Sequence, residues 1–189
     1  MLTDVQIINN GLAKIAASRI KRIDPPSSPL EGFMASNYQQ WKRSEIAKRR
    51  WVFALEKDYV MTLDSTLVDV DKPYKFLLPA DCLRPIRTKY SEWDQVGRYL
   101  RSNSETLSID FVRNTAESEF DVLFNDVLAS RVAYESVEYV TQSNKKKEDV
   151  MGMYERAVRD AAKNNAFVIG PEDLQADDND YSWVSSRYA

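Results

Sequence analysis

Residue types that could perform chemistry are scarce in this sequence. Its 189 residues include no histidine, one cysteine and five glycines. Without histidine the chain has no Ser/His or Cys/His nucleophile–base pair and no imidazole metal ligand. A single cysteine cannot form an internal disulfide or a cysteine-based zinc site, and the scattered glycines form no phosphate-binding loop. We therefore expect no enzyme activity, no catalytic residues, no metal and no cofactor.

The remaining reactive candidates have simple structural explanations. Cys82 lacks a histidine that could activate it, so we interpret it as a buried structural thiol. Paired carboxylates occur, for example Glu117 with Glu119 and Asp177 with Asp178. Two carboxylates at the right separation are sufficient for glycoside hydrolysis. No pattern around these pairs indicates a pocket that would raise one pKa, so we interpret them as surface charge.

A basic cluster interleaved with tryptophans is the candidate basic contact face. It comprises Lys42, Arg43, Arg49 and Arg50. Trp41 and Trp51 lie within or beside this cluster, which is typical of stacking platforms for single-stranded nucleic acid. An aromatic stripe at helical spacing is more often part of a core, and a basic helix face is more often solvated or paired. A nucleic-acid-binding module therefore remains an alternative function.

The net charge of −3 is unevenly distributed. Residues 171–189 contain five acids and one arginine, a net charge of −4, which leaves +1 for residues 1–170. This acidic C-terminal arm is also aromatic, which is unusual for an acidic disordered tail. Aromatic side chains are favoured interface anchors. The predicted partner-binding residues are Tyr181, Trp183, Val184 and Tyr188, and a frayed end is the alternative.

Hydrophobic periodicity predicts a helical bundle that carries a small β-insert. Helices are expected at about 4–20, 30–55, 120–142 and 145–167, with a β-rich insert at about 59–112. Within the insert, residues 99–112 are expected to form one hairpin. Gly11 lies inside the first helix and is interpreted as a point of close packing. The predicted fold class is mainly α with a small antiparallel β-sheet insert (α+β), with one domain over 1–170 and an extended arm over 171–189.

The N-terminus does not have the pattern of a secretory signal. Residues 1–8 lack a basic start, and no stretch approaches the 18 apolar residues of a membrane span. We expect synthesis in the cytoplasm and no contact with a membrane.

Four features occur in an order typical of one protein family. They are Ile8-Asn9-Asn10 with Leu12; Arg50-Trp51-Val52-Phe53-Ala54-Leu55; Tyr74-Lys75-Phe76-Leu77-Leu78-Pro79-Ala80-Asp81-Cys82-Leu83-Arg84; and a predicted helical hairpin with Tyr154 and several alanines. In these features the chain resembles the head-to-tail adaptor proteins of short-tailed bacteriophages, of the tail accessory factor or tail tubular protein A type. The resemblance covers most of residues 5–167.

The resemblance implies a structural role in a virion. Such an adaptor forms a homo-oligomeric ring, typically of twelve copies, below the portal protein at the head–tail junction. The ring extends the DNA channel and provides the attachment platform for the tail nozzle or other tail proteins. Double-stranded DNA would pass through the channel during ejection without sequence-specific binding. Synthesis would take place in the host cytoplasm. Some relatives degrade peptidoglycan, so a peptidoglycan-degrading virion protein is a second alternative.

Overall fold

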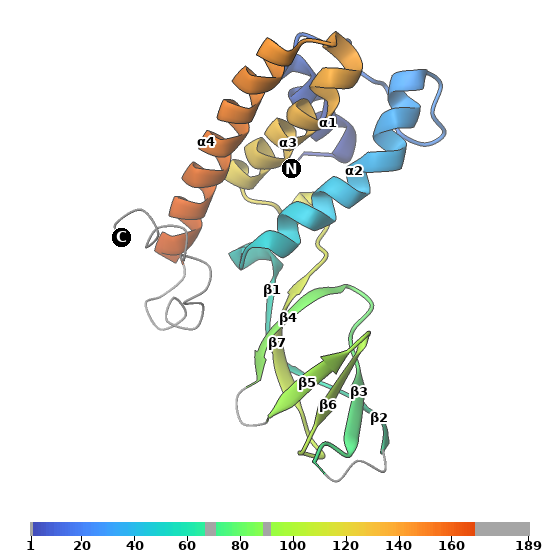
Figure 1. Ribbon diagram of the computed structural model, residues 1–189, viewed down its shortest axis with the longest axis vertical. Helices are drawn as coiled ribbons and strands as arrows, with labels where there is room; N and C mark the ends of the chain where they lie inside the picture. Colours follow the sequence, from blue (N-terminus) through green and yellow to red (C-terminus); the bar gives the residue numbers. More distant parts are fainter. Residues whose placement is uncertain (1, 67–70, 89–91, 169–189) are drawn as a thin grey trace. The chain divides into compact units, whose positions relative to one another are not determined.

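The chain folds into two compact units. The computed structural model describes residues 2–66, 71–88 and 92–168 (Figure 1). One unit, the helical unit, comprises Met1–Glu45 and Ala116–Ala189, and the other, the β-unit, comprises Ile46–Thr115. The expected α+β class with a small antiparallel β-insert is confirmed. The predicted arm at 171–189 lies outside the described residues.

Helix α1 spans Asp4–Lys14 and begins at a capping box. The Thr3 hydroxyl accepts a hydrogen bond from the Gln6 backbone N–H, and the Gln6 side chain accepts one from the Thr3 N–H at 2.8 Å. The predicted extent of 4–20 is wrong at its C-terminal end. The helix is capped at Ile15, and Ala16 adopts a left-handed conformation with φ 56°. The spacing of apolar residues predicts a helix but does not indicate the left-handed residue that ends it.

Two side chains hold the loop between α1 and α2. Asn9 accepts from the Ile20 N–H at 2.8 Å and donates to the Ile20 carbonyl at 2.9 Å. Glu31 is only 3% exposed and accepts from the Lys21 N–H at 3.0 Å and from the Ser27 N–H and hydroxyl, each at 2.6 Å. These hydrogen bonds, led by the one from the Ser27 hydroxyl, lower the pKa of the Glu31 carboxyl from 4.5 to about 2.

Helix α2 spans Pro29–Lys48, so the predicted helix over 30–55 is also too long. Trp51 has an extended backbone with φ −72° and ψ 129°, and a short 3-10 helix, η1, follows at Val52–Ala54. Strand β1 (Leu55–Val60) follows, and the Cα partner of Leu55 is Val112 in strand β7 (Ser108–Arg113). The long-range pairing with β7 overrides the local helical spacing.

Helices α3 (Val122–Thr141) and α4 (Asn144–Val168) confirm the predicted helical hairpin at 120–142 and 145–167. Asp121 caps α3 by accepting from the Phe124 N–H at 2.7 Å. Gln142 ends α3 in a left-handed conformation with φ 52°. Within the described part of the chain, none of the helices combines the length and apolarity needed to cross a bilayer.

Gly11 brings the backbones of α1 and α3 into close contact. A Cβ atom at this position would lie 2.5 Å from the Ala129 carbonyl oxygen and 2.8 Å from the Val132 Cβ. Real Cβ atoms essentially never approach other atoms below 3.0 Å. The interpretation of Gly11 as a point of close packing is therefore confirmed.

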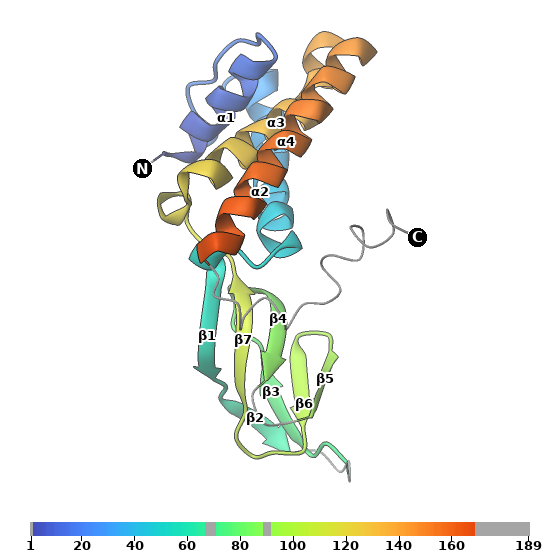
Figure 2. The same ribbon diagram turned by 90° about the vertical axis from the view of Figure 1, so that its left-hand side faces the viewer.

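Among the described residues of the β-unit, seven strands form two antiparallel sheets (Figure 2). The three-stranded sheet has the order β1-β7-β4, and the four-stranded sheet has the order β2-β3-β6-β5. One core cluster contains residues of both sheets: Met61, Phe76, Leu78, Cys82, Leu100, Leu107, Ile109 and Phe111. The strands are β1 (Leu55–Val60), β2 (Leu63–Thr66), β3 (Tyr74–Leu77), β4 (Cys82–Thr88), β5 (Trp93–Val96), β6 (Tyr99–Ser102) and β7 (Ser108–Arg113).

The predicted hairpin over 99–112 is wrong, although both of its strands exist. Strand β6 pairs with β3 and β5, whereas β7 pairs with β1 and β4. The intervening turn therefore leads from one sheet to the other. The hairpin present here is β5–β6, closed by the two residues Gly97 and Arg98. Gly97 has φ 62°, which a tight hairpin requires at the first loop position and glycine adopts without strain.

We expect Gly11→Ala to destabilise the protein, because the added methyl group requires the Ala129 carbonyl to move. Overpacking typically costs about 1–3 kcal/mol, and urea denaturation should show a loss of that size. Gly152→Ala in α4 is the matched control, since a Cβ there meets nothing within 4 Å. The control should stabilise by about 0.4–1 kcal/mol. Equal effects of the two substitutions would contradict a close approach at Gly11.

The lowered pKa of Glu31 predicts a pH-dependent contribution to stability. The folded state favours the charged carboxylate, so the contribution is complete above the ordinary value of 4.5 and is lost as the pH falls toward about 2. The wild type should therefore melt at a higher temperature than Glu31→Gln at neutral pH, and the difference should disappear near pH 2. Glu155→Gln, which removes a carboxylate at an exposed position of α4, is the matched control for the loss of one acidic group.

Candidate functional site

The four residues of the predicted basic contact face do not form one exposed surface. Lys42 and Arg50 are only 5% and 7% exposed. Arg43 is exposed and Arg49 is half-buried. Lys42 and Arg43 belong to the helical unit, whereas Arg49 and Arg50 belong to the β-unit. Burial makes Lys42 and Arg50 unsuitable as contacts for phosphates in solution.

The tryptophans near these residues are core residues. Trp41 is 8% exposed and Trp51 is 1% exposed. Trp41 packs on Phe33 with ring centroids 5.8 Å apart, and Trp51 stacks on Phe53 at 6.2 Å. Neither ring is available to stack on a nucleobase. The predicted arm residues Tyr181, Trp183, Val184 and Tyr188, and the pair Asp177 and Asp178, lie outside the described residues.

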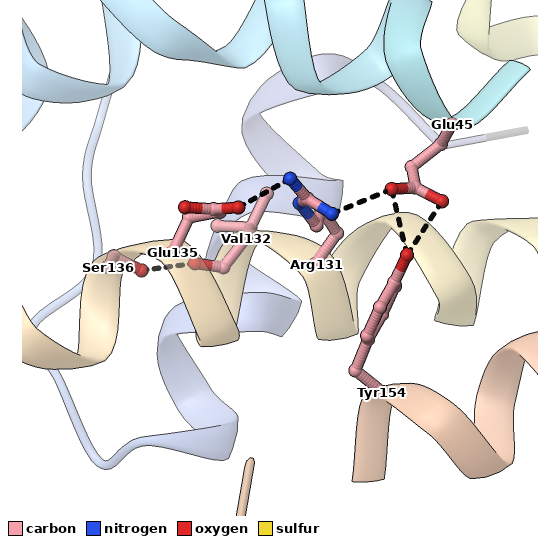
Figure 3. A network of polar contacts seen from close by, with 6 residues as sticks. All are labelled: Glu45, Arg131, Val132, Glu135, Ser136 and Tyr154. Atoms are coloured by element: carbon pink, nitrogen blue, oxygen red, sulfur yellow. Dashed lines mark hydrogen bonds and ion pairs between the residues drawn. The ribbon is translucent and has the colours of Figure 1, made fainter. Parts of the chain in front are cut away.

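A buried polar network joins three helices of the helical unit (Figure 3). Its centre is the carboxylate of Glu45 in α2, which is 2% exposed. The Tyr154 hydroxyl from α4 lies 2.9 Å from each of the two carboxylate oxygens and donates to that group. Arg131 from α3 donates from Nη1 to Oε1 of the same carboxylate at 3.2 Å.

Arg131 extends this network along α3. Its Nη2 atom lies 2.5 Å from the Glu135 carboxylate one turn further on, an i,i+4 ion pair. Burial tends to lower the pKa of Arg131, but contact with Tyr154 and the charges of Glu45 and Glu135 outweigh burial and raise it. The guanidinium therefore stays charged beside the buried carboxylate. In the next turn, the Ser136 hydroxyl donates to the Val132 carbonyl, as Figure 3 also shows.

A second buried ion pair fixes the segment that precedes α3. Lys42 Nζ lies 3.1 Å from Glu117 Oε1, and both side chains are largely buried. Burial first, and then the nearby charge of Glu117, raise the pKa of the buried Tyr38 phenol above its usual range. Tyr38 is therefore neutral at physiological pH. These contacts stabilise the packing of α2 against the chain before α3.

The candidate reactive groups are held in structural contacts. Burial raises the pKa of the Cys82 thiol to about 11, so the reactive thiolate is not favoured. Glu117 is paired with Lys42, and Glu119 accepts from the Ala116 N–H at 3.4 Å. Across residues 2–66, 71–88 and 92–168, no three Cys, Asp or Glu side chains are grouped closely enough to hold a metal ion.

The network around Glu45 was not predicted as a site, although its members carried a signal. Glu45 follows Tyr38 and Trp41 at helical spacing in α2, and Arg131 follows Val127 and Leu128 at helical spacing in α3. A charged residue on a core-facing row is expensive unless it is paired. Two such positions of opposite charge on neighbouring helices would have indicated a buried ion pair.

Comparison with known proteins adds no identification. Neither the models of protein families nor the curated proteins include a match to this chain.

We expect Tyr154→Phe to lower the free energy of unfolding, because a buried carboxylate loses a donor. A hydrogen bond to a charged group contributes about 1.5–3 kcal/mol. Tyr134→Phe is the matched control, since the Tyr134 ring stacks on Tyr154 at 6.2 Å and no hydrogen bond of its hydroxyl to a described residue is seen. Urea denaturation should show a much smaller effect for the control. In a Glu45→Gln background the Tyr154→Phe effect should shrink, and an unchanged effect would contradict the network.

Proposed function

We propose that this protein is a structural head-to-tail connector of a short-tailed bacteriophage virion. In this proposal, copies of the chain form a ring, with twelve as the expected number, below the portal protein. The ring extends the DNA channel and provides the platform for the tail nozzle or other tail proteins. The protein acts by contact and not by catalysis.

The observation that carries the proposal is the division of the chain into two units. The β-unit, Ile46–Thr115, is inserted in sequence between two segments of the helical unit. This is the order of helices, β-rich insert and helical hairpin on which the resemblance to adaptor proteins rests. A connector must bind its neighbours in the ring and also bind the next component of the tail. Two units, each with its own packed elements, give one chain two kinds of surface for these contacts.

The buried polar contacts of the helical unit support a structural role in the wall of a ring. Glu45, Arg131 and Tyr154 link α2, α3 and α4, and the close approach at Gly11 joins α1 to α3. Charged hydrogen bonds of this kind work only in one arrangement of the helices. A helical unit held in one arrangement suits a ring wall that must keep its shape while DNA passes.

The burial of two residues of the predicted basic contact face favours a ring through which DNA passes over a nucleic-acid-binding module. Binding to DNA depends on several exposed cations that neutralise phosphates. Here Lys42 is paired with Glu117, and Arg50 is 7% exposed. These side chains are unavailable for a continuous cationic surface. The predicted basic contact face is thus reduced to the exposed Arg43 and the half-buried Arg49.

Assembly with a portal protein tests the proposal. The protein is co-expressed with the portal protein from the same genome, and the purified complex is studied by native mass spectrometry and electron microscopy. We expect a ring bound to the portal, with twelve copies of the chain. No portal binding, together with no ring at any protein concentration, would overturn the proposal.

Two further measurements separate the proposal from its alternatives. A salt-dependent affinity for DNA that falls for Arg43→Glu but not for Lys146→Glu would favour the nucleic-acid-binding module. Both residues are exposed. Clearing of purified cell walls that is abolished by substituting a carboxylate would favour a peptidoglycan-degrading protein. The connector proposal expects neither result.

A further inference from the structure

The outer side of α4 carries a stripe of exposed cations that ends at an exposed aromatic residue. Arg156, Arg159 and Lys163 are all exposed and follow each other at spacings of three and four residues. Such spacings place side chains on one side of a helix. Phe167 lies one further turn along the same side and is 80% exposed. We call this surface the α4 stripe.

The α4 stripe carries a positive net charge. Asp160 and Glu155 are exposed on the same side of the helix, Glu155 one turn before Arg159, so three cations and two anions give a net charge of +1. The Arg156 guanidinium donates to the Gly152 carbonyl of its own helix at 3.2 Å. Neither Arg159 nor Lys163 forms an ion pair with any residue that the structure describes.

Apolar side chains are exposed at the same end of the helical hairpin. Val168 is 63% exposed next to Phe167, and Val122 is 83% exposed at the start of α3. The start of α3 and the end of α4 lie at one end of the hairpin because the two helices are antiparallel. Exposed apolar groups collected beside charged residues mark interaction surfaces more often than isolated ones do.

We propose that the α4 stripe is the docking surface for the acidic arm of the same chain, residues 171–189. The arm has a net charge of −4, from five acids and one arginine, and the stripe has a net charge of +1. The arm follows α4 closely in sequence, with only Ile169 and Gly170 between them. A tethered segment meets its site at an effective concentration in the millimolar range. The arm of the same chain is therefore favoured over that of a second copy.

The spacing of charges along the arm matches that along the helix. A docked arm would reverse direction after α4, and Gly170 and Pro171, residue types common in turns, occur at that point of the sequence. With about 1.5 Å per helical residue, Lys163 lies about 8 Å and Arg156 about 18 Å back from Val168. At about 3.3 Å per residue, an extended arm would place Asp173 within about 10 Å of the reversal and Asp177 about 20 Å from it. In this arrangement Asp173 would lie near Lys163, and Asp177 would lie near Arg156.

This docking does not depend on the connector function. It places the aromatic residues Tyr181 and Trp183 against the chain's own helical unit before any partner is present. A partner that binds the arm must first displace it from α4. The contact is electrostatic and exposed, so salt screens it and a partner can compete with it.

Hydrogen exchange of the full-length chain, followed by mass spectrometry, tests the proposal. Arm amides in the wild type should exchange about three- to tenfold more slowly than in Arg159→Glu/Lys163→Glu, because two or three exposed ion pairs are lost. The control Lys146→Glu changes an exposed lysine at the other end of α4 and should leave arm exchange unchanged. The protection should also decrease at high salt.

A charge swap completes the test. Combining Arg159→Glu/Lys163→Glu with Asp177→Lys/Asp178→Lys should restore slow exchange of the arm, whereas the second pair alone should abolish it. The proposal would be overturned if the charge reversals left the exchange rate of the arm amides unchanged. It would also be overturned if the charge swap did not restore their protection. Protection that rises with protein concentration, together with a dimer mass by light scattering, would assign the arm to a second copy and overturn docking within one chain.

Discussion

The buried carboxylate of Glu45 constrains how the helices of the helical unit pack against one another. Glu45 is 2% exposed, and a charge at that depth is costly unless it is neutralised and hydrogen-bonded. Its partners come from different helices, Arg131 from α3 and Tyr154 from α4. Any sliding or rotation of these helices would separate the partners and leave a buried charge unpaired. One arrangement of α2, α3 and α4 is therefore strongly preferred, and α1 joins them at Gly11, where only hydrogen fits.

The β-unit is organised by a different constraint. Its core cluster draws apolar residues from both sheets, with Phe76 and Leu100 from the four-stranded sheet and Ile109 and Phe111 from the three-stranded one. Strands β6 and β7 are neighbours in sequence and both contribute to this core, but they belong to different sheets. The core thus depends on pairing between distant segments, and a short turn is enough to move the chain from one sheet to the other.

The proposed connector function and the proposed docking of the arm rest on separate observations. The first rests on the order of the units and on a resemblance in sequence motifs. The second rests on the exposed α4 stripe and on the charge of the residues that follow α4. If both proposals hold, the helical unit has one surface, the α4 stripe, that the arm of the same chain can cover or leave exposed. That combination suits a component that should assemble only when its partner is present.

The fold class, the helical hairpin and the structural interpretation of Cys82 could all be predicted from the amino-acid sequence, because long apolar rows and the absence of histidine are local and compositional facts. It also indicated the tight contact at Gly11. It could not determine where α1 and α2 end or which strand pairs with β6, because those outcomes depend on segments far away in the chain. It grouped Lys42 with Arg50 as a contact face, since both are basic and close in sequence. Tertiary structure decided otherwise: Lys42 is paired with Glu117, Arg50 is buried, and the buried charges that organise the helical unit are brought together only when the three helices pack.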